Sequence, residues 1–356
     1  MDDLVNDLRK IIEPVQELVN QATSYIEPEI SSLLSRNITD KKLITQAFDD
    51  LLNYAGLSQS ADVLFKRLCN HYFFIFPDLV SDYITLYLDM YGDDENCYTD
   101  KYDDEGFYIS SIDIIKETKQ IMENKTMTII TGDTHGDFRQ IESLCILAGT
   151  TTEDLLIILG DAGINYYGGK KEMRFKSLLS ELPITMLCIH GNHERRPETL
   201  GTYKEILWNG GVVYIESEFP NLIFAKDGEV YNINGKKCIV IGGAYSVDKE
   251  YRLERGWSWW ADEQPSEEIK NCVETRLETE NWRVDAVFSH TAPLKYEPRE
   301  MFLDFIDDSK VDKETEIWLD TIEDRLDYTQ WYCGHYHTNK TIDKIRFLYN
   351  DFYEFK

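Results

Sequence analysis

Positive charge is scarce in this sequence. Its 356 residues include 37 lysines and arginines against 65 aspartates and glutamates, which gives a formal net charge of −28. A field of that sign repels nucleic-acid backbones and anionic lipid surfaces. The composition therefore disfavours extended nucleic acid and membranes as partners. Any phosphate-bearing substrate must be attracted locally, by bound cations or by a few arginines.

Cysteines are few, and long apolar runs are absent. None of the seven cysteines stands in a CxxC pair, and an odd, dispersed count indicates reduced thiols. No apolar run approaches the roughly 20 residues that a membrane span needs. The acidic start at Met1-Asp2-Asp3 lacks the layout of a signal peptide. We therefore expect a cytoplasmic protein without a membrane segment.

The first part of the chain is patterned as helices. Apolar residues recur at three- and four-residue spacing over residues 4–19, 43–54 and 63–88, with Pro77 at an expected helix start or kink. An acidic stretch over 91–106 is typical of a linker. We expect a helical region over 1–110 and a second domain over 111–356. The helical region carries no chemical motif. It is interpreted as a partner-binding or self-association module, with a cap over the active site or a stabilising appendage as alternatives.

From Thr126 onward the pattern changes to alternating strands and helices. Short apolar or β-branched runs predict strands, and helical patterns lie between several of them, which indicates an α/β domain. The later strands follow one another closely, and Asn234-Gly235 predicts a hairpin turn. A mixed sheet or two packed sheets is expected. The main strands are predicted over 126–131, 155–159, 184–189, 284–288 and 329–333, and helices over 138–148 and 171–182.

Histidines and carboxylates are concentrated directly after five of these runs. Six of the seven histidines fall in four patches, and a fifth patch adds Asp161. Ligands of α/β sheets bind outside the carboxyl ends of strands, so these patches could converge on one site. Imidazole, carboxylate and amide groups together suit divalent metals. The patches are Gly132–Gly136, Gly160–Gly163, His190–Glu194, Ser289–His290 and Gly334–His337.

The ordered set of GDTHGD, GDAG, GNHE, SH and GHYH resembles the calcineurin-like metallophosphoesterases. The resemblance covers roughly residues 126–345. It implies a two-sheet α/β sandwich flanked by helices, and two divalent metal ions, with manganese expected first and iron, zinc or others as alternatives. One metal would be held by Asp133, His135, Asp161 and His337, and the other by Asp161, Asn192, His290 and His335.

The resemblance also implies the reaction. A hydroxide bridging the two metals would attack the phosphorus of a phosphate ester, and Asp161 would bridge the metals. His193 would act as general acid or electrostatic aid at the leaving group. Arg195 and Arg196 follow it and could clamp a phosphate oxygen. We also expect His335 and His337 to point the same way, since residues two apart on an extended chain do so.

The chain departs from the family pattern after Asp161. Many members carry an Asp-Arg pair there, and this chain has Ala162-Gly163-Ile164-Asn165 followed by Tyr166 instead. The loss of that arginine counts against a protein Ser/Thr phosphatase, although GNHE itself is phosphatase-like. The Tyr166 loop, which looks mobile, and the aromatic and basic segment 242–260, with Arg252 and Trp257, could shape a pocket for a nucleotide-like substrate.

The sequence thus predicts a metal-dependent phosphoesterase. Within enzymes the alternative is a protein Ser/Thr phosphatase. From another class, the alternative is a scaffold of the same fold that binds a partner protein and has lost catalysis. The complete set of expected ligands argues against the scaffold.

Overall fold

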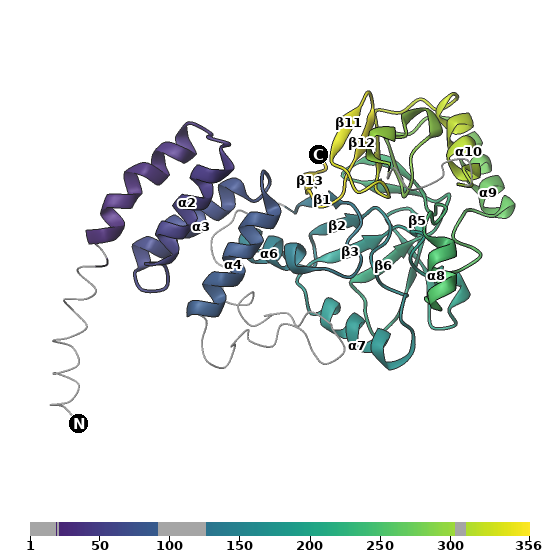
Figure 1. Cartoon of the computed structure of the whole chain (residues 1–356). Helices are drawn as coiled ribbons and strands as arrows, with labels where there is room; N and C mark the ends of the chain where they lie inside the picture. Colours follow the sequence, from purple (N-terminus) through teal and green to yellow (C-terminus); the bar gives the residue numbers. More distant parts are fainter. Residues whose placement is uncertain (1–18, 20, 92–125, 303–310) are drawn as a thin grey trace. The chain divides into compact units, whose positions relative to one another are not determined.

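The computed structural model describes residue 19 and residues 21–91, 126–302 and 311–356. The chain divides into two compact units (Figure 1). One contains the chain up to Met122 together with Arg139–Gly149, and the other contains Glu123–Phe138 and Thr150–Lys356. Of the linker expected over 91–106, only Tyr91 is described, and it is helical. The expected boundary at 110/111 and nearly all of the helix expected over 4–19 fall outside the described residues.

The first unit is helical. It contains a helix over residues 21–35 and helices α2 (Lys41–Leu52), α3 (Gln59–Tyr72), α4 (Pro77–Tyr91) and α6 (Arg139–Ala148). The helical pattern expected over 63–88 forms two helices, and α4 begins at Pro77 as expected, because proline fits the first turn of a helix. Aromatic rings fill the interior, with Phe48 stacked on Tyr83 at a centroid distance of 4.7 Å.

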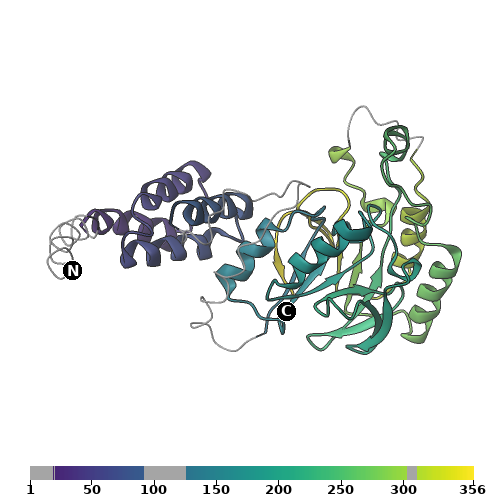
Figure 2. The same cartoon turned by 90° about the horizontal axis from the view of Figure 1, so that it is seen from below.

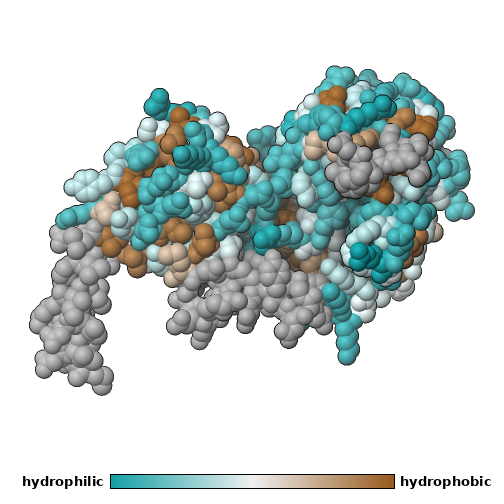
Figure 3. Space-filling view, viewed as in Figure 1, coloured by the Kyte–Doolittle hydropathy of each residue, from teal (hydrophilic) through white to brown (hydrophobic). Residues whose placement is uncertain are grey.

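Large apolar side chains also lie on the surface of this unit. Figure 3 shows them as brown areas among hydrophilic residues over the helices. The most exposed are on the first helix and along α2 to α4. They are Tyr25, Leu43, Leu57, Val63, Phe74, Ile75, Leu86 and Met90.

The second unit is built on two mixed sheets. The first has seven strands in the order β13-β1-β2-β3-β6-β5-β4. Strands β1, β2, β3 and β6 are parallel, while β13, β5 and β4 are antiparallel additions at the two edges. The bounds are β1 Thr128–Thr131, β2 Leu155–Ile158, β3 Thr185–Cys188, β4 Lys204–Trp208, β5 Gly211–Ile215, β6 Leu222–Ala225 and β13 Tyr353–Glu354.

The second sheet has six strands in the order β11-β12-β10-β9-β8-β7. Strands β8, β9, β10 and β12 are parallel, and β7 and β11 pair antiparallel at the edges. Asn234 and Gly235 both have positive φ between β7 and β8, as the predicted hairpin requires. The bounds are β7 Val230–Ile233, β8 Lys236–Ile241, β9 Ala286–Ser289, β10 Gln330–Cys333, β11 Lys340–Ile342 and β12 Ile345–Phe347.

Two apolar layers hold this unit together. One lies between the sheets and joins residues such as Ile157 and Leu187 to Val240 and Phe288. The other lies on the outer face of the second sheet, where α9 (Glu267–Thr279) and α10 (Glu314–Glu323) cover it, on one side of the unit in both views (Figures 1 and 2). Helix α7 (Gly169–Ser180) contacts β6, and the short helix α8 (Lys249–Arg255) follows the second sheet's β8.

The expected fold class, a two-sheet α/β sandwich with flanking helices and a helical N-terminal region, is confirmed. All six cysteines in the described part are free, and five of them are buried. No helix among the described residues is both long enough and apolar enough to cross a bilayer.

Candidate metal centre

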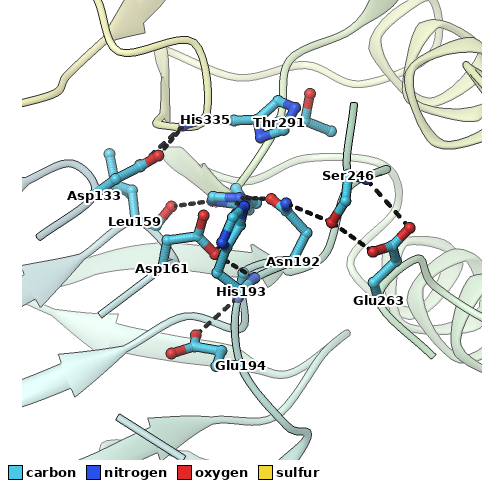
Figure 4. Close-up of polar contacts among 12 residues, drawn as sticks. Asp133, Leu159, Asp161, Asn192, His193, Glu194, Ser246, Glu263, Thr291 and His335 are labelled. Carbon is cyan, nitrogen blue, oxygen red and sulfur yellow. Dashed lines mark hydrogen bonds and ion pairs between the residues drawn. The ribbon is translucent and has the colours of Figure 1, made fainter. Parts of the chain in front are cut away.

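The histidine and carboxylate patches lie at the carboxyl ends of strands from both sheets. They follow β1, β2 and β3 in the first sheet and β9 and β10 in the second. Within each sheet these strands are parallel neighbours, so their carboxyl ends share an edge. Figure 4 shows Asp133, Asp161, Asn192, His193 and His335 converging there.

One group of side chains joins the ends of β1 and β10. His337 Nε2 lies 3.3 Å from Asp133 Oδ2 and 3.0 Å from His135 Nε2. Asp133 is buried, whereas both imidazoles are open to solvent. The backbone N–H of His335 donates to both oxygens of Asp133, at 2.9 and 3.1 Å, which fixes the carboxylate.

A second group joins the ends of β2, β3 and β9. His290 Nε2 lies 2.8 Å from Asn192 Oδ1 and 3.6 Å from Asp161 Oδ1. The other ring nitrogen of His290, Nδ1, lies 2.8 Å from the carbonyl oxygen of Leu159. Because a carbonyl only accepts, Nδ1 carries the proton, and the lone pair of Nε2 in the neutral ring faces Asn192 and Asp161. His335 packs against the His290 ring at a centroid distance of 5.0 Å.

This chemistry fits divalent metal ions. The donor atoms in each of three overlapping sets lie within 4.8 Å of one another. Lone pairs facing each other at such distances repel unless a cation lies among them. Carboxylate and imidazole ligands with one amide suit manganese, iron or zinc. The sets are Asp133–His135–His337, His135–Asp161–His193 and Asp133–Asp161–His290.

Electrostatics favour the metal-binding protonation states of Asp161 and His335 and raise the pKa of His337. Burial raises the pKa of the Asp161 carboxyl, but His290, His193 and His135 outweigh burial and bring it below its usual range. Desolvation lowers the pKa of His335 to about 3, so its ring is neutral at pH 7. The contact with Asp133 raises the pKa of His337, which marks a place where a positive charge is stabilised.

The backbone is strained where these side chains are presented. His135, Asp161, His335 and His337 have φ of 48°, 50°, 66° and 47°, a left-handed conformation that non-glycine residues rarely adopt. Such strain gathers at functional sites because the surrounding structure holds it in place. The backbone also passes very close to the carboxylates. A Cβ on Gly191 would lie 2.0 Å from Asp161 Oδ1, and one on Gly334 would lie 2.2 Å from Asp133 Oδ1.

The extended conformation expected for the Gly334–His337 patch is wrong. Both histidines have positive φ in a bend after β10. The strand has ended by then, so alternation along a strand does not set their directions. Instead, His335 lies beside His290, and His337 lies against Asp133.

His193 lies beside the two groups. Its backbone N–H donates to Asp161 Oδ1 at 2.8 Å, and its half-buried ring makes an edge contact with His135 at a centroid distance of 5.2 Å. Its Nε2 lies 3.9 Å from Asp248 Oδ1. The following Glu194 is buried and accepts the Gly191 N–H at 2.9 Å, which holds this turn together.

The two arginines expected to bind phosphate differ. Arg195 is half-buried, its Nε donates to the carbonyl oxygen of Asn165 at 3.4 Å, and no carboxylate pairs with it among the described residues. Arg196 is buried, and its guanidinium is bonded to Asp227 at 2.6 Å and to the carbonyl oxygen of Asp262 at 2.8 Å. This arrangement contradicts the phosphate contact expected for Arg196, because its charge is neutralised inside the protein.

The loop carrying Tyr166 is anchored, contrary to the expectation of a mobile loop. The backbone N–H groups of Asn165 and Tyr167 donate to the buried carboxylate of Glu172, at 2.6 and 2.9 Å. Tyr166 makes an edge contact with Trp260 at 5.6 Å, which joins this loop to the aromatic segment after β8.

The other two expected substrate contacts also differ in exposure. Arg252 is fully buried, and it bonds to Ser246 Oγ at 3.3 Å and to the carbonyl oxygen of Ser258. It therefore acts inside the fold, which contradicts direct stacking or pairing with a substrate. Trp257 is 54% exposed and packs edge-on against Tyr251.

Sequence reasoning missed Ser246 and Glu263. Ser246 Oγ accepts from Asn192 Nδ2 at 2.9 Å and donates to Glu263 Oε2 at 2.6 Å (Figure 4). Both residues lie far from Asn192 in sequence, and serine and glutamate are ordinary surface residues. The only available signal was their place in or just after the aromatic and basic segment 242–260.

Comparison with known families gives one match. The family model of the calcineurin-like phosphoesterases matches residues 127–339, which is more than half of the 356-residue chain. The matched range contains every residue of both donor groups. No curated protein matches the chain.

Proposed function

Since the chain belongs to the calcineurin-like phosphoesterase family, we propose that it hydrolyses a phosphate ester with the help of two divalent metal ions. The observation that carries this proposal is the convergence of carboxylate, imidazole and amide groups from five strand ends, with His290 Nε2 only 2.8 Å from Asn192 Oδ1.

We assign the expected ligands to two positions. Asp133, His135, Asp161 and His337 would hold one ion, and Asp161, Asn192, His290 and His335 the other. The contacts of Asp161 with both His135 (3.9 Å) and His290 (3.6 Å) support its place in both sets. Bound divalent ions neutralise phosphate charge and lower the pKa of water. Manganese is the ion we propose to test first, with iron and zinc next.

The remaining polar groups would bind and orient the ester. The guanidinium of Arg195, which pairs with no carboxylate of the described residues, would hold a phosphate oxygen by charge-assisted hydrogen bonds. The ring of His193 would give a proton to the leaving oxygen as the P–O bond breaks, while water supplies the new oxygen on phosphorus and releases a proton. The proximity of His193 to Asp161 and His135 supports this role.

A nucleotide-like ester is the substrate class we favour. Tyr166 and Trp260 form an aromatic contact joining two loops, and Trp257 adds an exposed indole on the same segment. Aromatic side chains stack on bases, and Arg195 would pair with phosphate. The alternative of a protein Ser/Thr phosphatase lacks support in the loop after Asp161, which carries Ile164-Asn165 in place of the expected Asp-Arg pair.

We also propose that the helical unit binds a partner protein or a second copy of this chain. Its exposed apolar side chains, such as Val63 at 54% and Met90 at 53%, support an interaction surface. The free cysteines are in keeping with a cytoplasmic location, which we propose as well.

The test is hydrolysis of p-nitrophenyl phosphate and bis(p-nitrophenyl) phosphate by the purified full chain loaded with Mn²⁺, with a chelator-treated sample beside it. We expect turnover that the chelator abolishes and added Mn²⁺ restores. The ratio of the two rates separates monoesterase from diesterase, and a nucleotide panel and a phosphopeptide panel then separate the two substrate classes.

Absence of turnover on both esters and both panels, with two equivalents of Mn²⁺ shown to be bound, would contradict the proposed hydrolytic activity. It would favour the scaffold instead. A chain that binds no divalent metal at all would contradict the metal centre itself.

A further inference from the structure

Ser246 lies behind Asn192, on the side away from His290. Its hydroxyl oxygen is 2.9 Å from Asn192 Nδ2 and 2.6 Å from Glu263 Oε2, and all three side chains are buried (Figure 4). The group is therefore shielded from water, and its hydrogen bonds must be made to other protein groups.

The direction of these hydrogen bonds is fixed by Glu263. Its carboxylate receives the Ser246 hydroxyl, the Ser246 backbone N–H at 3.2 Å and the Trp259 indole N–H at 2.7 Å. A carboxylate with three donors aimed at it acts as an acceptor only. The single hydroxyl hydrogen of Ser246 is consequently used by Glu263, and its oxygen can only accept from its other neighbours.

Those neighbours are the amide of Asn192 and the guanidinium of Arg252, whose Nη1 lies 3.3 Å away. Because Ser246 accepts, it is the NH₂ of Asn192 that must face it. The amide oxygen then faces His290 and Asp161. A rotated amide would bring its oxygen against the serine oxygen with no hydrogen between them, which is unfavourable in a buried site.

Without Ser246 the opposite orientation would be preferred in the metal-free protein. The carbonyl oxygen of Leu159 uses the Nδ1 proton of His290, so in the neutral ring Nε2 is an acceptor that attracts an N–H group. An amide NH₂ turned toward His290 would satisfy that acceptor but has no lone pair for a metal ion.

We propose that Ser246, held by Glu263, is a positioning residue that presents the amide oxygen of Asn192 to a divalent metal ion. This inference rests on the proposed metal centre. It adds that the aromatic segment after β8, which contains Ser246 and Trp259, orients the amide of Asn192, a proposed metal ligand on the turn after β3. Groups that orient metal ligands typically change metal affinity by about 10–100-fold.

The test is Mn²⁺ binding to the metal-free full chain, measured by calorimetry, with no substrate present. Ser246→Ala should weaken the site that contains Asn192 by about 10–100-fold. Ser258→Ala, an exposed serine of the same segment, should leave binding unchanged. Glu263→Gln should act in the same direction as Ser246→Ala, because the carboxylate accepts the Ser246 hydroxyl on Oε2 and the Ser246 N–H on Oε1, and an amide can accept only one of them. It serves as the second variant should Ser246→Ala fail to fold.

The decisive comparison uses Asn192→Asp as background. A carboxylate offers an oxygen in either orientation, so it needs no orienting serine. There, Ser246→Ala should have no effect or should improve binding, because an oxygen–oxygen contact is relieved. Equal weakening of Mn²⁺ binding in both backgrounds would mean a merely structural role and would overturn the proposal.

Asn192→Ala separates this inference from the proposed function. If Asn192→Ala binds Mn²⁺ as the unchanged chain does, the ligand assignment itself is wrong. If Asn192→Ala weakens binding while Ser246→Ala and Glu263→Gln do not, the assignment stands and only the role of Ser246 is overturned.

Discussion

His135 Nε2 lies 3.0 Å from His337 Nε2, although 202 residues separate the two histidines in the chain. They come from strands of different sheets, β1 and β10. Two imidazole nitrogens at that distance share either a proton or a metal ion, and the raised pKa of His337 beside Asp133 shows that the spot favours positive charge. A metal bound there would join the two sheets directly.

Asp161 is the residue whose loss should be most damaging to activity. Asp161→Asn keeps the size and the acceptor for the His193 N–H but removes the charge, so the fold should persist. We expect turnover to fall by about 100-fold or more and Mn²⁺ content to drop. Metal analysis and initial rates check this, with the exposed turn residue variant Asp343→Asn as control. Wild-type rates in Asp161→Asn would contradict the ligand assignment.

Close backbone approach at Gly191 gives a prediction with a matched control. A Cβ there would lie 2.0 Å from Asp161 Oδ1, whereas a Cβ on Gly201 would meet nothing within 4 Å. Gly191→Ala should displace Asp161, abolish metal-dependent turnover and destabilise the fold by about 1–3 kcal/mol. Gly201→Ala should retain activity and stability. Denaturant melts and rate measurements on the two variants test this prediction. Equal stability and equal turnover in the two variants would contradict it.

Arg195 should contribute to substrate binding without contributing to metal binding. Arg195→Ala removes a charge-assisted hydrogen bond of about 1.5–3 kcal/mol, so kcat/KM should fall by about 10–100-fold at unchanged Mn²⁺ content. Arg255→Ala, an exposed arginine over the Tyr251 ring, is the control. Loss of metal in Arg195→Ala would show instead that the residue supports the turn around Asn192.

Glu316 should make stability depend on pH. It lies on α10 and accepts the Thr291 hydroxyl at 2.8 Å, and burial raises its pKa from 4.5 to about 7. Below pH 4.5 the carboxyl is protonated in both the folded and the unfolded chain. As pH rises toward 7 the unfolded chain ionises first, so the free energy of unfolding falls, by about 3 kcal/mol in all.

Glu316→Gln removes this titration. Its free energy of unfolding, relative to the unchanged chain, should rise between pH 4.5 and 7.5, as measured by urea melts at several pH values. Glu314→Gln, at an exposed position on the same helix, is the control and should show no such trend. If the difference in free energy of unfolding between Glu316→Gln and the unchanged chain does not vary with pH, the raised pKa of Glu316 is contradicted.

Much of the fold could be predicted because its central strands are nearly uniform apolar runs. Strands β1, β2 and β9 are buried along their whole length, and that burial is what the apolar pattern records. Strand β4 was missed because it is an edge strand whose apolar residues, Ile206, Leu207 and Trp208, follow one another without the alternation of a half-buried strand. Helices α9 and α10 were missed because their buried faces mix charged with apolar residues, with Lys270 buried in α9 and Glu316 in α10.

The candidate site was predictable in its residue types but not in its orientations. Asp161 and His290 follow strands, and strand ends meet by topology alone. Arg196 pairs with Asp227, which lies 31 residues further along the chain, and no local sequence pattern around Arg196 predicts this pair. The same holds for Ser246 and Asn192, which are 54 residues apart and meet through a single hydrogen bond.

The positive φ angles at His135, Asp161, His335 and His337 set stability and activity against each other. Glycine at any one of them would relax the backbone by about 1 kcal/mol or more, yet it would remove a side chain from the centre. Selection for thermal stability alone would therefore favour glycine at these four positions, and the side chains that form the candidate metal centre would be lost. An attempt to stabilise this protein should hold the four residues constant and seek stabilising substitutions on the outer helices and loops.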